Sequence, residues 1–306
     1  MTHKMREIKK VLFIVNPISG NQDKDALIDF VEKQLKNRQL DLISYSTKGE
    51  NDKEAIRQIL GSQEIDRILV AGGDGTIKMV AEVVIAEDKN IPIGIFPEGS
   101  ANGLALNLEI PESKEEQLDV ALGENILHID VVKINDDFSL HIADFGVNAE
   151  LIKNFEKHEL RGKIGYLIQS IPTLVKSNYP FEFTIETQEG VYEKEGTVLA
   201  IANCQKYGTG ARINPDGKMN DGKFELILFK NLNLIDLIKT LTDNLPLSSD
   251  FAETFICNSA KIKCKKGLPF QVDGEYIGEV EQVEVSIMKK ILPVTVSNSF
   301  AQENKN

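Results

Sequence analysis

The sequence is poor in cysteine, and its three cysteines are Cys204, Cys257 and Cys264. Their number is odd and none belongs to a CxxC pair, so the sequence indicates neither a disulfide framework nor a zinc site and favours a reducing compartment. Proline is also scarce, at 10 of 306 residues, while 42% of the residues are hydrophobic and 27% are charged. This composition excludes wholesale disorder and collagen-like repeats, and it is typical of a globular protein.

Long apolar runs are missing as well. No stretch reaches the roughly 18 consecutive apolar residues that a membrane-spanning helix needs. The run Val11–Val15 follows a basic N-terminus but stops at Asn16-Pro17, which is too short for the apolar core of a signal peptide. We therefore expect a soluble cytoplasmic protein in which this run forms a buried first strand.

An excess of positive charge is also absent. The chain has 35 Lys and Arg against 47 Asp and Glu, a formal charge of −12. Such an acidic protein is poorly suited to hold a nucleic acid through its overall field, so we expect no nucleic-acid partner. Lys261, Lys263 and Lys265 alternate along one strand-like run and would present a local basic stripe to a membrane. A solvated strand face is the alternative, and the favoured one.

The first third of the chain alternates short apolar runs with helical periodicity, and its length of 306 residues suits two modest domains. The alternation predicts right-handed βαβ units and a parallel sheet. The expected strands are 11–15, 40–45, 68–70 and 91–96.

The remainder of the chain carries strand-like runs in which apolar and polar residues alternate between turn signals. The runs are 128–134, 181–187, 198–203, 224–229 and 280–287, and helical stretches are expected at 163–175 and 234–241. This pattern predicts a mainly antiparallel sandwich or barrel. We place an α/β domain at 1–125, a β domain at 126–296 and a frayed polar tail at 297–306.

A glycine-rich turn, Gly72-Gly73-Asp74-Gly75-Thr76, stands directly between a buried strand and a helix. Glycines allow close approach of the backbone to a ligand, and free amides at a helix start attract phosphate. An aspartate there would repel bare phosphate, so the turn favours a nucleotide complexed with a metal ion. The alternative is a tight turn in which Asp74 caps its own helix.

Two more glycine-containing turns, Asn16–Gly20 and Pro97–Gly103, follow the first and fourth expected strands. All three turns leave the carboxyl ends of strands, the edge at which open α/β sheets bind ligands. Thr47 follows the second strand at the same edge. The patterns GxxxxGK[ST] and GxGxxG are both absent, which excludes a Walker-type NTPase and a dinucleotide dehydrogenase.

The motifs NPISG, GGDGT and PEGSANGLA, in this order, resemble the diacylglycerol kinase catalytic-domain family, which includes bacterial lipid kinases and the sphingosine and ceramide kinases. The resemblance continues through Tyr207–Asp216, Asn220-Asp221-Gly222 and Val272–Glu275, and it spans residues 10–296. GGDGT alone is shared with NAD kinases and phosphofructokinases. The ordered set is far more specific.

The resemblance implies a three-layer α/β domain with a parallel sheet, similar to NAD and diacylglycerol kinases, followed by a mainly antiparallel β-sandwich. The last segment of the chain is expected to return to the first domain. ATP is expected in the cleft between the domains, with Mg²⁺ as cofactor. The implied activity is phosphorylation of a hydroxyl of diacylglycerol or a related lipid, such as a sphingoid base or monoacylglycerol.

The resemblance also implies roles for single residues. Asp273 would be the general base, although an Asp-Gly hairpin turn is the interpretation from the residues alone. Asp221, also in an Asp-Gly turn, would hold a structural Mg²⁺ with the backbone carbonyls of Lys218 and Lys223. Asp74 would serve the Mg²⁺ of ATP, although the base role is an alternative for it. The expected ATP-binding residues are Asn16, Pro17, Ile18, Ser19, Gly20, Thr47, Gly72, Gly73, Asp74, Gly75, Thr76, Ile77, Lys78, Met79, Gly99, Ser100 and Asn102.

Three positions depart from the family pattern. Gly103 stands where many members have Asp, Ser100 replaces the commoner Thr, and Met79 replaces a Glu. Because GGDGT is shared, an NAD kinase-like enzyme remains an alternative. Met79, which cannot coordinate Mg²⁺, and Gly103 leave a weakly active nucleotide- or lipid-binding regulator as another. The expected partner is a lipid at a membrane surface, with peripheral contact at most on the inner membrane face. Oligomeric state is left open, with a homodimer as one option.

Overall fold

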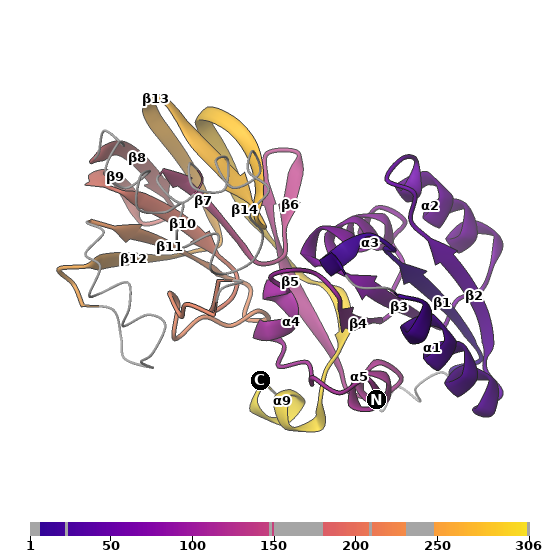
Figure 1. Ribbon diagram of the computed structural model, residues 1–306. Helices are drawn as coiled ribbons and strands as arrows, with labels where there is room; N and C mark the ends of the chain where they lie inside the picture. The colour runs from indigo at the N-terminus through magenta and orange to yellow at the C-terminus, as the bar shows by residue number, and fades with distance from the viewer. Residues whose placement is uncertain are drawn as a thin grey trace. The chain divides into compact units, whose positions relative to one another are not determined.

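The computed structural model describes residues 7–21, 24–146, 149, 180–207, 210–230 and 248–304. The chain forms two compact units (Figure 1). Unit 1 consists of Met1–Ile129 and Lys290–Asn306, and unit 2 of Asp130–Lys289. The unit 1 boundary therefore lies four residues beyond the predicted residue 125.

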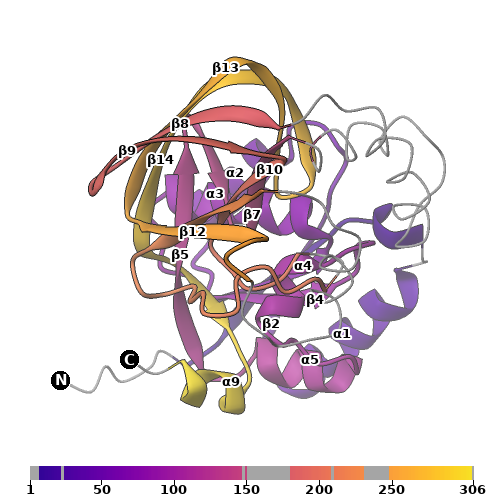
Figure 2. The same cartoon turned by 90° about the vertical axis from the view of Figure 1, so that its left-hand side faces the viewer.

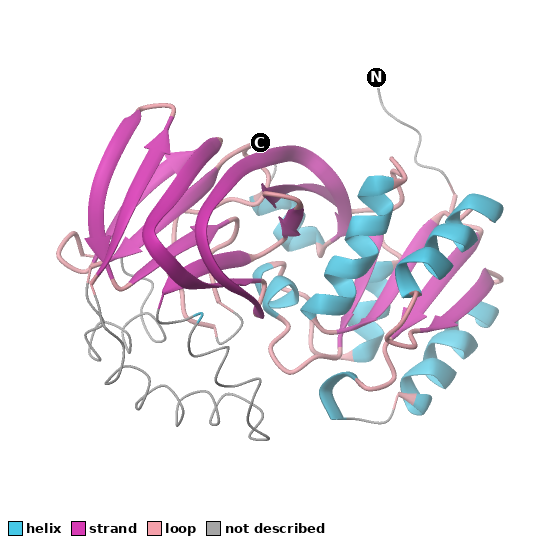
Figure 3. Ribbon diagram, turned by 90° about the horizontal axis from the view of Figure 1, so that it is seen from above, coloured by secondary structure: helices cyan, strands magenta, loops and turns pink. Residues whose placement is uncertain are grey.

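Unit 1 is built on a parallel sheet with strand order β4-β3-β1-β2. Its helices lie on both faces of this sheet (Figure 3). The end of the long strand β14 adds to the sheet through Val294, which pairs in parallel with Ile93. The strands of unit 1 are β1 (Lys10–Val15), β2 (Asp41–Ser46), β3 (Arg67–Gly72) and β4 (Ile93–Pro97), and the helices are η1 (Ser19–Asn21), α1 (Asp25–Asn37), α2 (Asp52–Ser62), α3 (Asp74–Ala86), α4 (Gly103–Asn107), α5 (Lys114–Ala121) and α9 (Asn298–Glu303).

The core of unit 1 follows directly from the sequence pattern. β1 and β3 are buried along almost their whole length, as strands covered on both faces must be. The apolar stripe of α1 packs on one face, together with α5 and the rings of Phe13 and Phe96, whose centroids are 6.1 Å apart. Apolar residues of α3 are buried as well, among them Ile77, Val80 and Val84.

Unit 2 is an antiparallel β structure. Its strands follow the order β12-β11-β10-β7-β13-β14, and β8 pairs with both β13 and β9. β13 and β14 are long and curved (Figure 2), and their pairing register shifts between Lys263 and Leu268, as at a β-bulge. The bounds are β5 (Ile126–Ile134), β6 (Asp137–Ser139), β7 (Ile142–Gly146), β8 (Phe181–Thr187), β9 (Gly190–Gly196), β10 (Val198–Ala202), β11 (Phe224–Phe229), β12 (Ala252–Cys257), β13 (Ser259–Val272) and β14 (Glu275–Thr295).

The predicted fold class, a parallel α/β domain followed by a mainly antiparallel β domain, is confirmed. The expectation of a frayed tail is wrong, because α9 forms there. Ser297 caps this helix by accepting a hydrogen bond from Phe300 N, and the Phe300 side chain is only 9% exposed. The helices expected at 163–175 and 234–241 lie outside the described residues. None of the helices within the described ranges is long and apolar enough to span a membrane.

Candidate active site

The three glycine turns of unit 1 meet at the carboxyl edge of the sheet. Asn16, directly after β1, donates its backbone N–H to Ala71 O of β3 at 2.8 Å. Its side-chain Nδ2 donates to Thr76 Oγ1 in the first turn of α3 at 3.0 Å. The Asn16–Gly20 turn is therefore tied to the GGDGT turn by backbone and side chain alike.

Glycine is required where the turns cross. A Cβ added at Gly73 would lie 3.1 Å from the Cα of Gly99, and one added at Gly99 would lie 2.8 Å from Asn102 Oδ1. Gly20 has φ +65°, and a Cβ there would collide with the carbonyl group of Glu98. The backbones of the three turns are thus in contact, which only residues without side chains permit.

Asp74 caps a helix other than its own. It is the first residue of α3, whose N-cap is Gly73 and has no side-chain cap. Its carboxylate instead accepts hydrogen bonds from the N–H groups of Gly103 at 2.7 Å and Leu104 at 3.0 Å, at the start of α4. The alternative in which Asp74 caps its own helix is therefore wrong, and the capping joins the GGDGT turn to the PEGSANG turn.

The PEGSANG turn is closed by Asn102. This residue has φ +55°, and its side chain accepts a hydrogen bond from Gly99 N and donates to Gly99 O. Ser100 is exposed beside it. Asn102 therefore shapes the loop, while Ser100 has a side chain that a ligand can reach.

The other predicted ATP contacts differ in accessibility. Ile77 is fully buried and Lys78 is 6% exposed, so contact of Ile77 with a nucleotide would need its backbone. Gly75 and Ile18 are exposed, Ile18 to 81%. Met79 is half-buried. The turn residues, more than the α3 side chains, are thus available to a ligand.

Sequence reasoning missed the role of Asp52, which organises the loop that carries Thr47. Its carboxylate accepts hydrogen bonds from Lys48 N, Gly49 N and Tyr45 Oη. Burial is the largest of the causes that raise the pKa of Tyr45 to about 12. The hydrogen bond to Asp52 and the negative charge of Asp52 add to the rise. Thr47 N donates to Val15 O, which fixes the loop at the sheet edge.

In unit 2, Asp273 and Gly274 form the turn between β13 and β14 with φ values of +52° and +88°. Positive φ at both central residues is the type I′ hairpin geometry. The Asp273 carboxylate accepts hydrogen bonds from Ser139 Oγ and from three backbone N–H groups, at distances of 2.8 to 3.1 Å. These backbone donors are Leu140, His141 and Ile142. The side chain is therefore held in one orientation as an acceptor.

A buried polar network supports this turn and was not expected from the sequence. Gln271 Oε1 accepts from Gly274 N at 2.7 Å, and Gln271 Nε2 donates to Asp144 Oδ2. Tyr207 Oη donates to the same Asp144 oxygen at 2.9 Å. The network thus joins the Asp273 turn to the segment that begins at Tyr207.

The Asn220-Asp221-Gly222 turn is rich in oxygen ligands. Asp221 Oδ1 accepts from Lys223 N, and buried Asp130 accepts from Gly222 N at 2.6 Å. Burial raises the pKa of nearby Glu225, and Asp221 contributes to the rise. Asn203, 1% exposed, donates to Asp130 O, while its own Oδ1 has no hydrogen-bond partner among the described residues. Negative charge and an unpaired buried oxygen both fit a hard cation such as Mg²⁺.

Among the residues that the structure describes, no group of three or more His, Cys, Asp or Glu side chains is arranged to hold a metal ion. The predicted Mg²⁺ site combines one carboxylate, Asp221, with the carbonyls of Lys218 and Lys223. A site with a single carboxylate is not a group of three or more His, Cys, Asp or Glu side chains. The Mg²⁺ site at Asp221 therefore remains a prediction.

The lysine stripe on β13 is neutralised by carboxylates. Lys261 pairs with Glu284 at 2.9 Å, Lys265 pairs with Glu182 at 2.9 Å, and Lys263 pairs with Glu186. Each lysine charge is thus balanced by a carboxylate on a neighbouring strand. This geometry supports the solvated strand face over the membrane-binding stripe.

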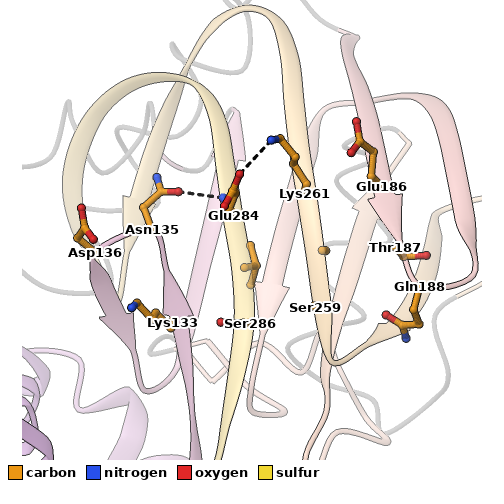
Figure 4. Close-up of a pocket in the computed structure, with 12 residues that line it drawn as sticks. Lys133, Asn135, Asp136, Glu186, Thr187, Gln188, Ser259, Lys261, Glu284 and Ser286 are labelled. Carbon is orange, nitrogen blue, oxygen red and sulfur yellow. Dashed lines mark hydrogen bonds and ion pairs between the residues drawn. The ribbon is translucent and has the colours of Figure 1, made fainter.

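A groove of about 710 Å³ lies on the same sheet of unit 2 (Figure 4). Lys133 and Lys261 line it together with Asp136, Glu186 and Glu284. Two cations against three carboxylates do not attract an anionic ligand. The groove therefore does not add to the candidate nucleotide site.

The chain is thus a two-domain protein. A parallel α/β unit carries three glycine turns on one sheet edge, and the chain continues into an antiparallel β unit. Residues 10–134 match the diacylglycerol kinase catalytic domain, and residues 142–296 match the YegS C-terminal NAD kinase beta sandwich-like domain. The chain belongs to this diacylglycerol kinase family, and the resemblance seen in the motifs is confirmed.

Named relatives agree with this membership. The chain is 31% identical to a probable lipid kinase YegS-like of Chromohalobacter salexigens, over 69% of this chain and 70% of the relative. It is 25% identical to a diacylglycerol kinase of Bacillus subtilis, over 93% and 95% of the two chains. A putative diacylglycerol kinase structure from Bacillus anthracis shares the fold, with a TM-score of 0.79, 20% identity and coverage of 96% and 99%.

Proposed function

We propose that this protein is an ATP- and Mg²⁺-dependent lipid kinase that transfers the γ-phosphate of ATP to a hydroxyl of diacylglycerol or a related lipid, such as a monoacylglycerol or a sphingoid base. The observation that carries the proposal is the contact of three glycine turns at the carboxyl edge of the unit 1 sheet. This edge is where open α/β sheets bind ligands, and backbone amides there suit phosphate. The relatives named as lipid kinases support the same activity.

In this proposal the turns Asn16–Gly20, Gly72–Thr76 and Gly99–Asn102 bind the ATP phosphates. The glycines allow the backbone to approach the ligand, and the start of α3 contributes the partial positive charge of a helix N-terminus. Asp74, proposed to act toward the Mg²⁺ of ATP, also caps α4, which fixes the spacing between two of the turns. Thr47 donates its hydroxyl from the loop organised by Asp52.

Asp273 serves as the general base in the proposed reaction. The lipid hydroxyl attacks the γ-phosphorus of ATP, the bond to the β,γ-bridging oxygen breaks, ADP leaves, and the hydroxyl proton passes to the Asp273 carboxylate. The four donors around this carboxylate hold it ready as an acceptor. Phosphoryl transfer depends mainly on positioning and charge stabilisation, so orientation of the base matters more than its strength.

Mg²⁺ would be held by Asp221 and the carbonyls of Lys218 and Lys223, with Asp74 acting toward the Mg²⁺ of ATP. When bound, the Mg²⁺ of ATP would supply charge neutralisation for the transferring phosphate, and the ion at Asp221 would be structural. The oxygen donors and excess negative charge of the 220–223 turn support this assignment.

The test is incubation of the purified protein with labelled ATP and vesicles that contain diacylglycerol, monoacylglycerol, a sphingoid base or phosphatidylglycerol, with and without Mg²⁺. We expect a labelled lipid in the presence of Mg²⁺ and none after chelation. No labelled lipid under any condition would exclude the proposed activity. Conversion of NAD to NADP would favour an NAD kinase-like enzyme, and tight ATP binding without turnover would favour a regulator.

A further inference from the structure

A cluster of three charges, a buried Lys24–Glu98 pair and the half-exposed Lys114, lies in unit 1 and is hereafter the ion triad. Lys24 and Glu98 are 3% and 8% exposed, and Lys24 Nζ is 2.6 Å from Glu98 Oε2. Lys114 pairs with the other carboxylate oxygen, Oε1. Burial alone would raise the pKa of Glu98, but hydrogen bonds from Lys114 and Lys24 outweigh it and hold the pKa below its usual value. Charges are rarely buried unless they are paired, so the triad requires an explanation.

The three members come from separate parts of unit 1. Lys24 is the N-cap residue of α1, Glu98 lies in the turn after β4, and Lys114 begins α5. The Lys24–Glu98 pair joins residues 74 positions apart in the chain. The triad therefore fixes the turn after β4 to two helices at once.

Glu98 also stands where the three glycine turns meet. Its backbone N–H donates to Gly72 O at 2.9 Å, and its carbonyl occupies the space that a side chain at Gly20 would need. The next residue, Gly99, is in contact with Gly73. The backbone of residues 98–99 thus touches both neighbouring turns, and the Glu98 side chain anchors this backbone to Lys24 and Lys114.

We infer that the ion triad positions the phosphate-binding turns, so that Glu98, Lys24 and Lys114 set the affinity for a nucleoside triphosphate without touching it. The inference rests on the proposed function, because it assigns ATP to these turns. Backbone amides bind a polyphosphate chain only when several of them are correctly placed together, and displacement by about 1 Å is enough to cost up to 10²-fold in rate.

The charge of the triad acts in the same direction. Two lysines and one glutamate leave one net positive charge (2 − 1 = 1) beside turns that receive an anion, in a protein with a total charge of −12. A local positive potential favours the approach of a polyanion. The positioning effect of the triad and the effect of its charge can be measured separately, because one substitution removes the Lys24–Glu98 link and another removes the charge of Lys114.

The double variant Lys24→Met/Glu98→Leu removes the link but keeps the volume and the net charge of the triad, since Lys114 remains. Apolar replacement of a buried ion pair is often neutral or stabilising, so the fold should persist. Lys114→Gln instead removes one charge and keeps the buried pair. The matched control is Lys194→Met/Glu253→Leu, which removes a half-buried ion pair of unit 2.

ATP affinity is measured by isothermal titration calorimetry with Mg²⁺ and without lipid, and the melting temperature is recorded for each variant. We expect Lys24→Met/Glu98→Leu to weaken ATP binding about tenfold or more, as misplaced turns require. Lys114→Gln should weaken it by up to about fivefold, with a loss that shrinks at high salt, because its side chain is 40% exposed. The unit 2 control should leave the dissociation constant unchanged.

Unaltered ATP affinity in the folded double variant, whatever its melting temperature, would show a merely structural triad and would overturn the inference alone. Absence of ATP binding by the unaltered protein would overturn the proposed function and the inference with it. Should the double variant not fold, ATP affinity is measured in Glu98→Asp instead. The shorter aspartate side chain cannot reach both lysines, so this variant also breaks the triad. Unchanged ATP affinity in folded Glu98→Asp would also exclude the positioning role.

Discussion

The carboxylate of Asp74 caps the helix that begins at Gly103, with 2.7 Å between Asp74 Oδ2 and Gly103 N. The two residues belong to different glycine turns, and their bond joins the start of α3 to the start of α4. Gly103 stands where many family members carry an aspartate.

We therefore expect Asp74→Ala to lower the free energy of unfolding by about 0.5–2 kcal/mol, the usual cost of a lost cap. ATP binding should weaken as well, because the two turns lose one of the bonds that join them. Chemical denaturation and calorimetry measure the two effects. Asp74→Asn keeps one acceptor oxygen and should retain part of the stability; equal losses in Asn and Ala variants would contradict the capping role.

Substitution of Gly99 by Ala should disrupt the turns. The added Cβ would lie 2.8 Å from Asn102 Oδ1 and would meet the Cα of Gly73, which is backbone and cannot move aside. We expect a loss of about 1–3 kcal/mol, typical of overpacking, and strongly weakened ATP binding.

Gly61 provides the matched control. It lies inside α2, and a Cβ there would have no neighbour within 4 Å. Gly61→Ala should therefore stabilise the protein by about 0.5–1 kcal/mol through helix propensity, without a change in ATP affinity. Similar behaviour of the two variants in thermal denaturation would argue against the close approach at Gly99.

Asp273→Asn should lower the turnover number for lipid phosphorylation by about 10²–10⁴, since the amide cannot accept the hydroxyl proton. The amide nitrogen would also face a backbone donor, so stability should fall by about 1–3 kcal/mol. The assay is initial-rate kinetics at a temperature where the variant is folded. Exposed Asp136→Asn is the control, and a loss below about tenfold in Asp273→Asn would exclude the base assignment.

Glu98 should make stability depend on pH in the acid range. Its pKa lies below the ordinary value of 4.5 in the folded state, so its pairing stabilises the protein fully above pH 4.5 and less as the pH falls through the folded pKa. Glu98→Gln should cost about 3–5 kcal/mol at neutral pH, because Lys24 loses its buried partner. The difference in unfolding free energy between the two proteins should shrink below pH 4.5. A difference that is constant with pH would show that the charge of Glu98 does not contribute.

Binding of Mg²⁺ at Asp221 should stabilise the folded protein. An ion that binds only the folded protein stabilises it by about 2.7 kcal/mol at 100 times its dissociation constant. Mg²⁺ should therefore raise the melting temperature of the unaltered protein, chelation should reverse the rise, and Asp221→Asn should abolish most of it. An undiminished rise in Asp221→Asn would place the ion elsewhere.

Much of the architecture could be predicted from the sequence, because burial leaves a local pattern. The run Val11–Val15 is a strand covered on both faces, and the alternating residues 181–187 form β8 within the predicted bounds. Parallel strands place their carboxyl ends on one edge, so the meeting of the three glycine turns followed from connectivity alone. The positive φ values of Asp273 and Gly274 followed from the Asp-Gly pair.

The partners of charged and polar side chains were not predictable in this way. Asp74 was expected to serve the Mg²⁺ of ATP, with a cap of its own helix as the alternative, and it caps α4 instead of α3. Lys263 was expected in a basic or solvated face and pairs with Glu186 of β8. The polar tail was expected to fray, yet Phe300 is buried there. Each of these outcomes depends on which distant segment lies next to the residue.

The sequence by itself thus determined the fold class, the order of the strands along the chain and the position of the glycine turns, since these depend on hydrophobic period and local backbone preference. Tertiary structure alone decided that Glu98 meets Lys24 across 74 positions and that Asp74 serves a second turn. Hydrogen bonds and ion pairs form between whatever groups folding brings within about 3 Å, and no local pattern encodes that proximity.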